Sequence, residues 1–382
     1  ALQTLKSGVE QAGEPLDATI HAVGHAHIDV AWLWTLAQTR RKAERTFHTV
    51  IRLMEQFPDY RFSQSQPQLY QFIKEDQPAL FEAVRQRVRE GRWEPLGGMW
   101  VEADCNISSG EALIRQILFG LRFYREEFGA RPRTCWLPDV FGYPATLPAI
   151  LQGCGIPFFY TNKLHWQARN PFPHHLFWWE GIDGARVLAH IPRLKSYYNG
   201  HPTPQEIQIA WDNFNEKRLY DEVMLPFGYG DGGGGPTEEM LEYARRASRY
   251  PGLPACRQGL EEAYFDRVMA AAPDLPAWRG ELYLETHRGT FTTQAAVKRA
   301  NRRAELLLRE AEILGALANL SGAAIDLDAL RPAWQNLLLL QFHDILPGSS
   351  IGEVYAEVLQ DYAQITRIGE QVRDRALQWI AQ

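Results

Sequence analysis

The chain alternates between short apolar runs and amphipathic stretches in which apolar residues recur with a helical period. The apolar runs end in glycine, proline or charged residues, and they predict buried strands. Strands are expected at 20–29, 61–66, 93–101, 134–137, 157–162, 185–191 and 223–227. Helices are expected at 39–57, 68–90, 108–128, 147–152, 204–215 and 237–248. Strands that alternate with helices are typical of the α/β class, with a mostly parallel sheet and covering helices.

The pattern changes near Arg288, where short strands give way to long helical stretches. Helices are expected at 292–317, 330–340 and 351–382. Their apolar residues fall on one face, which is typical of helices that pack side by side in an antiparallel bundle of three. The sequence therefore predicts an α/β catalytic domain at 1–287 and a helical bundle domain at 288–382.

The first strand ends in a polar tip that carries His25, His27 and Asp29. Residues two apart on a strand share a face, so the three side chains are expected to line one side together. Two imidazoles and a carboxylate suit Zn²⁺ or a similar divalent ion. The alternative is a set of ordinary surface residues at a strand end.

Two further segments offer partners for such a metal ion. Asp139 follows the strand at 134–137, and His343 lies in a polar turn between two helices. Functional residues concentrate at such strand ends and loops. Together with His27 and Asp29, they form a set of two nitrogen and two oxygen ligands that suits Zn²⁺. A plain helix C-terminus, with a histidine on the helix dipole, is the alternative for His343.

Two loops add more carboxylates. The glycine-rich loop 228–237 follows a strand and precedes a helix, but it lacks the Lys-Ser/Thr pair of a nucleotide-binding loop. Its Asp231 is better suited to bonding hydroxyl groups. The segment 280–290 brings Glu281 and Glu285 to the junction of the two domains.

Composition narrows the class of protein. The chain has 382 residues, 45% of them hydrophobic and 23% charged, which is ordinary for a globular protein with a large core. A net charge of −6 argues against nucleic acid or an anionic membrane as the partner. No apolar run reaches the roughly 18 residues that a membrane span needs. Four scattered cysteines and a polar N-terminal stretch favour a cytoplasmic location.

Six blocks of sequence, spread over most of the chain, resemble the class II α-mannosidases of glycoside hydrolase family 38. They are GHAHIDVAWLW at 24–34, WLPDVFGY at 136–143, FPHHLFWWEGIDG at 172–184, GYGDGGGGPT at 228–237, GELYLETHRGT at 280–290 and QFHDILPGSSI at 341–351. The blocks occur in the family's order and are most similar to its cytosolic, vacuolar and bacterial branch. The resemblance implies a (β/α)7-type barrel followed by the family's helical middle domain.

The resemblance also implies a retaining, exo-acting α-mannosidase that removes terminal α-linked mannose through a covalent glycosyl-enzyme intermediate. It assigns one Zn²⁺ ion, which holds mannose hydroxyls, to the four ligands above, and it identifies Asp139 as the nucleophile. His25 is not a ligand in the family. The positions implied for substrate binding are Trp32, which stacks beneath the sugar, Asp231, Asp344 and, by a looser match, Lys163.

The acid/base residue stays open between two glutamates. A retaining glycosidase needs a second carboxyl group, with a raised pKa, about 5–5.5 Å from the nucleophile. Glu285 and Glu281 fall on the same face of an extended segment, so the pattern does not separate them. Glu285 is favoured because it lies closer to the domain junction.

Two other functions fit part of the pattern. A metal-dependent polysaccharide deacetylase would use a related barrel and a metal-activated water. An inactive mannose-binding fragment would keep the site without turnover. Family members continue into β-sandwich domains beyond the helical domain, so the chain is expected to be a truncated form of a longer protein. Its expected partner is a mannose-containing oligosaccharide or glycan, and the sequence leaves room for a homo-oligomer.

Overall fold

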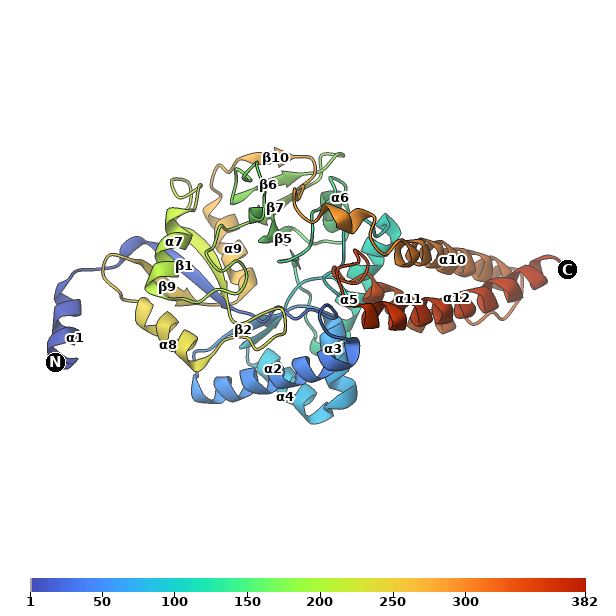
Figure 1. Ribbon diagram of the computed structural model, residues 1–382, viewed down its shortest axis with the longest axis horizontal. Coiled ribbons are helices and arrows are strands. Elements are labelled where there is room, and N and C mark those ends of the chain that lie inside the picture. Colours follow the sequence, from blue (N-terminus) through green and yellow to red (C-terminus); the bar gives the residue numbers. More distant parts are fainter. Residues whose placement is uncertain (1) are drawn as a thin grey trace.

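The computed structural model describes residues 2–382, in which an α/β part is followed by three helices that project from it (Figure 1). The strands are β1 (Leu16–Gly24), β2 (Phe62–Gln64), β3 (Trp93–Pro95), β4 (Thr134–Trp136), β5 (Phe158–Tyr160), β6 (Leu176–Glu180), β7 (Arg186–His190), β8 (Glu222–Phe227), β9 (Pro254–Gln258) and β10 (Ala277–Arg279). The helices of the α/β part are α1 (Leu2–Gln11), α2 (Leu36–Gln56), α3 (Pro67–Asp76), α4 (Pro78–Arg89), α5 (Gly110–Phe128), α6 (Leu147–Gly153), α7 (Pro204–Asp212), α8 (Glu238–Ala247) and α9 (Glu261–Ala271). The helices that follow are α10 (Ala295–Leu320), α11 (Arg331–Leu340) and α12 (Gly352–Ile380). Short 3₁₀ turns lie at Lys163–His165, Arg288–Phe291 and Asp328–Leu330.

The strands pair in two five-stranded sheets. One sheet has the order β3–β2–β1–β8, with β9 also paired with β1, and the other has the order β10–β6–β7–β5–β4. Neighbours in both sheets are parallel, except that β6 is antiparallel to β7. The predicted α/β class and mostly parallel pairing are confirmed. A closed barrel is not confirmed, because across residues 2–382 no ladder joins β3 to β4 or β7 to β8.

Several predicted elements need correction. The helix predicted at 68–90 is two helices, because Pro78 lacks an N–H donor and restricts Gln77, which has extended-like angles of φ −140° and ψ 66°. The strand predicted at 93–101 ends at Pro95, and the chain then turns at Gly97, whose φ is +70°. Strands β6, β9 and β10 and helix α9 were not predicted.

The three C-terminal helices pack against one another and are anchored to the α/β part through α5. The Arg115 guanidinium on α5 donates to both carboxylate oxygens of Glu312 on α10, at 2.9 and 2.6 Å. The same guanidinium lies 3.8 Å from the ring centre of Trp334 on α11. Gln116, the next residue, donates from Nε2 to the Leu338 carbonyl at 2.8 Å. These contacts fix α11 next to the α/β part, and the turn after α11 therefore reaches the carboxyl ends of the strands.

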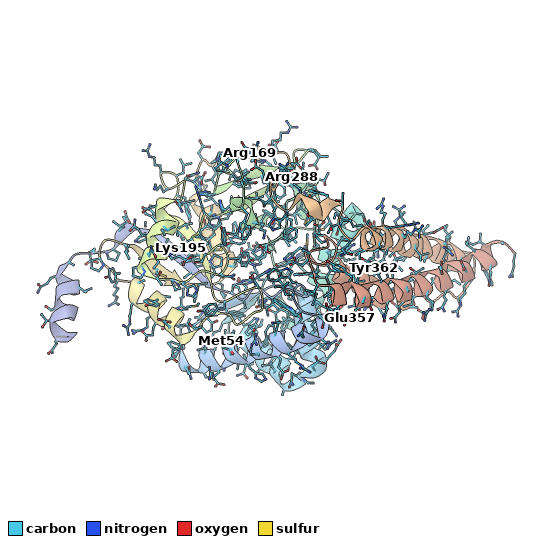
Figure 2. All side chains as sticks on the ribbon, viewed as in Figure 1. Met54, Arg169, Lys195, Arg288, Glu357 and Tyr362 are labelled. Atoms are coloured by element: carbon cyan, nitrogen blue, oxygen red, sulfur yellow. The ribbon has the colours of Figure 1, made fainter. Side chains whose placement is uncertain are left out.

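Side chains fill the centre of the α/β part, whereas many on the distal ends of α10 and α12 project outward (Figure 2). The largest fully buried side chains include those of Trp93, Trp100, Trp136 and Trp179. No helix among the described residues is both long and apolar enough to cross a membrane. The four cysteines are free thiols, as their scattered spacing indicated.

Candidate active site

The predicted site residues gather where parallel strands end. His27 and Asp29 follow β1, Asp139 follows β4, Lys163 follows β5 and Asp231 follows β8. This is the end of the sheet at which α/β enzymes carry their sites. A cavity of about 410 Å³ opens there, and its wall consists of Asp29, Trp32, Asp139, Phe141, Lys163, Trp166, Tyr197, Tyr198, Asn199, Asp231, His287, Asp344 and Ser349. The volume lies in the range of small-molecule sites.

The segment after β1 is held in place by the glycine-rich loop. The Asp29 N–H donates to the Asp231 carbonyl at 2.7 Å, and Ile28 forms a β-bridge with Gly232. The loop can approach this closely because Gly228 has no side chain. Its φ is +132°, and a Cβ there would lie 2.3 Å from the His25 carbonyl oxygen. The glycine run therefore positions Asp231 beside Asp29 and does not form a phosphate loop.

The turn after α11 carries His343 into the same place. Phe342 forms an antiparallel bridge with Ala103, and the His343 N–H donates to the Glu102 carbonyl at 3.2 Å. As a result, His343 Nε2 lies 3.6 Å from Asp29 Oδ1 and 3.7 Å from Asp139 Oδ2. His343 is fully buried, so the alternative of a histidine on an ordinary helix end does not describe it.

The four predicted ligands lie next to one another, but the groups of described residues compact enough to surround an ion combine two of His27, Asp29 and His343 with Asp231, Asp344 or Glu102, and not with Asp139. His27 Nε2 lies 2.9 Å from Asp29 Oδ1. The two distances from His343 Nε2 given above, to Asp29 Oδ1 and to Asp139 Oδ2, are 3.6 and 3.7 Å. Tetrahedral bonds of about 2.0–2.1 Å would separate ligand atoms by about 3.3 Å, which lies within the observed spread. His27 Nε2, Asp29 Oδ1 and His343 Nε2 are buried and have no hydrogen-bond partner among the described residues. Unpaired buried polar atoms that face one another are expected where a cation binds.

The electrostatics of this group also favour a cation. Although burial opposes ionisation, the positive charge of the nearby His27 ring lowers the pKa of Asp29 to about 2. Burial likewise opposes the charged form of His343, yet Asp29, Asp344 and Asp139 raise the pKa of that imidazole to about 9. Burial and the charge of Asp29 raise the pKa of Asp344 to about 7. The carboxylates thus create a surplus of negative charge, which a divalent ion would neutralise.

Asp139 occupies the wall of the cavity with its two oxygens in different surroundings. Oδ1 accepts a hydrogen bond from Lys163 Nζ at 2.7 Å, while Oδ2 faces His343. The Lys163 ammonium also lies 4.3 Å from the Trp166 ring centre. Lys163, expected as a loose substrate contact, is therefore engaged with Asp139 and an aromatic ring as well as lining the cavity.

Asp231 and Asp139 line the same cavity, together with Tyr198. Tyr198 Oη donates a hydrogen bond to Asp231 Oδ1 at 3.0 Å. Burial, followed by the charges of Asp139 and Asp231, raises the pKa of Tyr198 well above its usual value, so the phenol stays protonated. The two carboxylates therefore face one cavity, and the Tyr198 hydroxyl helps to hold Asp231 there.

The two glutamates of segment 280–290 are placed elsewhere. Neither Glu281 nor Glu285, both within the described chain, contributes to the cavity wall. Glu285 Oε2 accepts from the Arg169 N–H at 2.6 Å and from the Asn170 N–H at 3.3 Å. The bond from Arg169, followed by those from Asn170, lowers the pKa of Glu285, whereas an acid needs a raised pKa. Glu281 is exposed to solvent. The geometry therefore supports neither as the acid.

The expectation that His25 shares a face with His27 and Asp29 is wrong. The strand ends at Gly24, so strict alternation stops before the motif. His25 is buried, and its ring centre lies 5.0 Å from that of Trp136 in the interior. Trp32 is partly exposed and forms part of the cavity wall.

Three neighbours of the metal-ligand group were not singled out from the sequence. Glu102, buried at the exit of the predicted strand 93–101, contacts both histidines. Its position after an apolar run is the same signal that identified Asp139. Tyr198 and His287 line the cavity from irregular loops, where no periodic pattern marks them.

Comparison with known proteins identifies the family of the chain. Residues 17–281 match the family model described as the glycosyl hydrolases family 38 N-terminal domain, and residues 285–380 match the alpha mannosidase middle domain. The chain belongs to glycoside hydrolase family 38. The family resemblance in the six sequence blocks is thereby confirmed.

Named relatives are similar to this family 38 chain over nearly all of its length. Alpha-mannosidase 2C1 of Homo sapiens is 42% identical over 361 residues, covering 94% of this chain and 35% of that protein. Alpha-mannosidase G of Dictyostelium discoideum is 42% identical over 346 residues, covering 91% and 32%. The chain therefore spans about a third of the length of these relatives. A solved alpha-mannosidase from Enterococcus faecalis V583 has the same fold, with a TM-score of 0.82 at 19% identity over 96% of this chain and 43% of that one.

Proposed function

We propose that this chain is the catalytic part of a retaining, exo-acting α-mannosidase that hydrolyses terminal α-linked mannose of an oligosaccharide or glycan. The observation that carries the proposal is the pair of carboxylates, Asp139 and Asp231, that line one cavity beside His27, Asp29 and His343. A retaining glycosidase needs two carboxyl groups at the scissile bond, one as the nucleophile and one as the acid/base. Relatives at 42% identity carry the name alpha-mannosidase, which supports this substrate class.

In the proposed mechanism, Asp139 is the nucleophile. Its carboxylate attacks the anomeric carbon and forms a covalent mannosyl ester as the bond to the leaving oxygen breaks. Water then attacks the same carbon from the opposite face of the ester, which releases mannose and frees Asp139. Two inversions leave the anomeric configuration unchanged, so the product is α-mannose.

We assign the acid/base role to Asp231 in place of Glu285 or Glu281. Asp231 faces the cavity from the loop after β8, and its Oδ1 is held by the Tyr198 hydroxyl. It would donate a proton to the leaving oxygen and then accept one from the attacking water. Glu285 is instead bound by main-chain N–H groups of the neighbouring segment, which supports a structural role for it.

We infer that His27, Asp29, Asp139 and His343 hold one Zn²⁺ ion. Mixed nitrogen and oxygen ligands at these separations suit zinc, and the buried unpaired atoms fit a cation. When bound there, Zn²⁺ would supply a Lewis acid that polarises vicinal sugar hydroxyls. Asp344, on the same wall, is proposed to accept hydrogen bonds from those hydroxyls, and Trp32 is proposed to stack against the sugar ring.

The finer architecture is also proposed. We infer that seven of the ten strands (β1, β2, β3, β4, β5, β7 and β8) form one (β/α)7 barrel, in which β8 approaches β7 and β4 approaches β3. The Met224 N–H on β8 donates to His190 Nε2 on β7 at 3.3 Å, which supports the first of these joints. The matches at 17–281 and 285–380 support a boundary near residue 287 and a three-helix bundle beyond it. The cytoplasmic location and a homo-oligomeric state stay predictions.

The function is tested by following the hydrolysis of an aryl α-mannoside by proton NMR. The proposal predicts that α-mannose appears first and that a chelator stops the reaction until Zn²⁺ is restored. β-Mannose as the first product would contradict the retaining mechanism. Release of acetate from an acetylated sugar without mannoside hydrolysis would favour the deacetylase. Calorimetric binding of mannose without turnover would favour an inactive binding fragment.

A further inference from the structure

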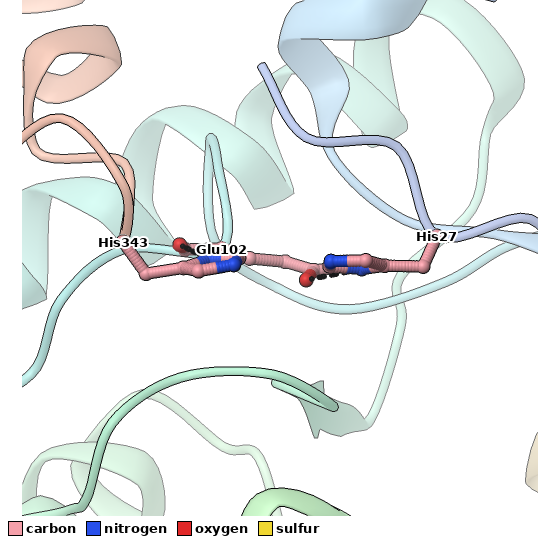
Figure 3. A group of neighbouring side chains, drawn as sticks. All are labelled: His27, Glu102 and His343. Atoms are coloured by element: carbon pink, nitrogen blue, oxygen red, sulfur yellow. Dashed lines mark hydrogen bonds and ion pairs between the residues drawn. The ribbon is translucent and has the colours of Figure 1, made fainter. Parts of the chain in front are cut away.

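Glu102 lies between the two histidine ligands and contacts both of them (Figure 3). Its main-chain carbonyl accepts a hydrogen bond from His343 Nδ1 at 2.8 Å, and its carboxylate oxygen Oε2 lies 3.1 Å from His27 Nδ1. The side chain is almost completely buried, at 1% exposure. Glu102, in the α/β part, thus contacts one histidine from the α/β part and one from the helical part.

These contacts select the nitrogen that each imidazole offers to a metal. A carbonyl oxygen can only accept, so His343 Nδ1 must carry a proton, and the lone pair of the neutral ring then lies on Nε2. In His27 the contact is an ion-pair contact and not a hydrogen bond: the carboxylate oxygen of Glu102 lies 3.1 Å from Nδ1, and its negative charge favours a proton on that nitrogen. In both rings the Nε2 atom then faces Asp29 Oδ1, at 2.9 Å from His27 and 3.6 Å from His343. Glu102 therefore faces the outer edge of both rings, opposite the proposed ion.

The surroundings of Glu102 hold it in this position. Ser65 Oγ donates to Glu102 Oε1 at 2.7 Å, which leaves Oε2 for His27. Gln66 Oε1 accepts from the Glu102 N–H at 3.2 Å, while Gln66 Nε2 donates to the Ile28 carbonyl at 2.9 Å. Ile28 lies between the two ligands of the β1 tip. Gln66 therefore ties Glu102 to the segment whose histidine it contacts.

Gln66 makes both bonds from a strained backbone conformation. It is buried and has a φ of +67°, in the left-handed region that side-chain-bearing residues rarely adopt. Such strain persists where the surroundings over-determine a conformation, and it clusters at functional sites. The strained residue is directly bonded to Glu102, so the strain lies at the residue that holds this group.

We propose that Glu102 is a positioning residue that fixes the tautomer and the orientation of His27 and His343 for metal binding. This inference rests on the proposed zinc site. The competing role is that of a direct ligand, since Glu102, His27 and His343 also lie close enough together to surround an ion. The hydrogen bond from His343 Nδ1 to the Glu102 carbonyl opposes that role, because the protonated nitrogen has no lone pair for a metal.

The test compares Zn²⁺ affinity, measured by competition with a chromophoric chelator, in the full chain and in Glu102→Gln. The expected loss is about 10–100-fold, as for other residues that orient a metal-binding histidine. The matched control is Glu94→Gln on β3, which removes a carboxylate outside the cavity wall and should leave the affinity unchanged. Unchanged affinity in Glu102→Gln would overturn the proposal, and so would a loss as complete as that of His27→Ala, since it would identify a direct ligand.

A second readout separates positioning from misfolding. In the Zn²⁺-loaded chain with ¹⁵N-labelled histidine, both Nδ1–H protons should give slowly exchanging signals. Glu102→Gln should shift or broaden the His27 signal, while the His343 signal persists because its acceptor is the main-chain carbonyl. Ser65→Ala, which removes only the bond to Oε1, should weaken Zn²⁺ binding less than Glu102→Gln does. If both signals disappear in a folded Glu102→Gln protein, the proposal is wrong.

Failure of the positioning role can be distinguished from failure of the proposed function. Wild-type protein that binds Zn²⁺ and hydrolyses mannosides, with Glu102→Gln equally competent, would refute the positioning role alone. Wild-type protein that binds no Zn²⁺ would refute the metal site itself, and this inference with it.

Discussion

His343 Nε2 lies 3.6 Å from Asp29 Oδ1, although one residue follows α11 in the helical part and the other follows β1 in the α/β part. The contact depends on the pairing of the turn after α11 with the segment at 102–104. The proposed metal site therefore spans both matched regions of the chain, and metal binding should report on how these regions are joined.

Replacing His343 by alanine should weaken Zn²⁺ binding more than about 100-fold, because loss of a ligand exceeds the 10–100-fold effect of losing its outer partner. Metal content after dialysis, measured by mass spectrometry, checks this. His48→Ala, at an exposed position of α2, is the matched control. Equal metal content in the His343 variant and the wild type would contradict the four-ligand site.

The acid/base assignment predicts different results for two carboxylates. Asp231→Asn should slow hydrolysis of a mannose disaccharide by about 10²–10⁴-fold, because an unactivated leaving group needs a proton. Azide should restore turnover of an activated aryl mannoside, with mannosyl azide as the product. Glu285→Gln, whose carboxylate is bound by main-chain N–H groups, should hydrolyse the disaccharide nearly as well as the wild type. Azide rescue of Glu285→Gln and not of Asp231→Asn would reverse the assignment.

The junction between α5, α10 and α11 should depend on the planar guanidinium of Arg115. Lysine keeps the charge but cannot donate to both oxygens of Glu312 while lying on Trp334. Arg115→Lys should therefore lower the free energy of unfolding by roughly 1–2 kcal/mol, measured by urea denaturation. Arg245→Lys, at an exposed pair with Glu242, should change it by less than about 0.5 kcal/mol. Similar losses at both positions would show that the junction has no special role.

His190 should make stability depend on pH. The ring is buried, Nδ1 donates to the His175 carbonyl, and Nε2 accepts from the Met224 N–H. Burial lowers the pKa of His190 from its usual 6.5 to about 3. The unfolded chain therefore takes up this proton more readily, and the stability that His190 contributes above pH 6.5 is lost as the pH falls toward 3.

The variant His190→Gln tests that dependence. Between pH 7 and pH 5 the contribution of His190 should fall by about 2 kcal/mol, so the wild type should lose that much more unfolding free energy than the variant over this interval. Urea denaturation at both pH values gives the comparison. Parallel losses in the two proteins would show that His190 is not the group responsible.

Polar residues after apolar runs were the strongest signal in the sequence. His27, Asp29, Asp139 and Asp231 were identified in this way, because buried strands read as continuous apolar runs and their carboxyl ends meet at one edge. His343 was identified as a polar interruption between two helices. The sequence could not show that it meets Asp29, because that contact depends on a bridge between Phe342 and Ala103.

Sequence periodicity could not predict which distant residues a side chain contacts. Alternation put Glu281 and Glu285 on one face of a segment, but it gives no information on what that face meets. The carboxylate of Glu285 binds the backbone at residues 169 and 170, which no local pattern predicts. Gln66 shows the same limit, since its left-handed backbone is maintained by long-range bonds to Ile28 and Glu102.

The most direct test of the account is the covalent trapping of the glycosyl-enzyme intermediate. A fluorinated mannosyl fluoride, which forms the ester quickly and releases it slowly, is incubated with the protein, and the labelled peptide is identified by mass spectrometry. The account predicts one fluoromannosyl group on the peptide that carries Asp139, and no label on Asp139→Asn. A label on another carboxylate, or mannoside hydrolysis that never yields a labelled protein, would contradict it.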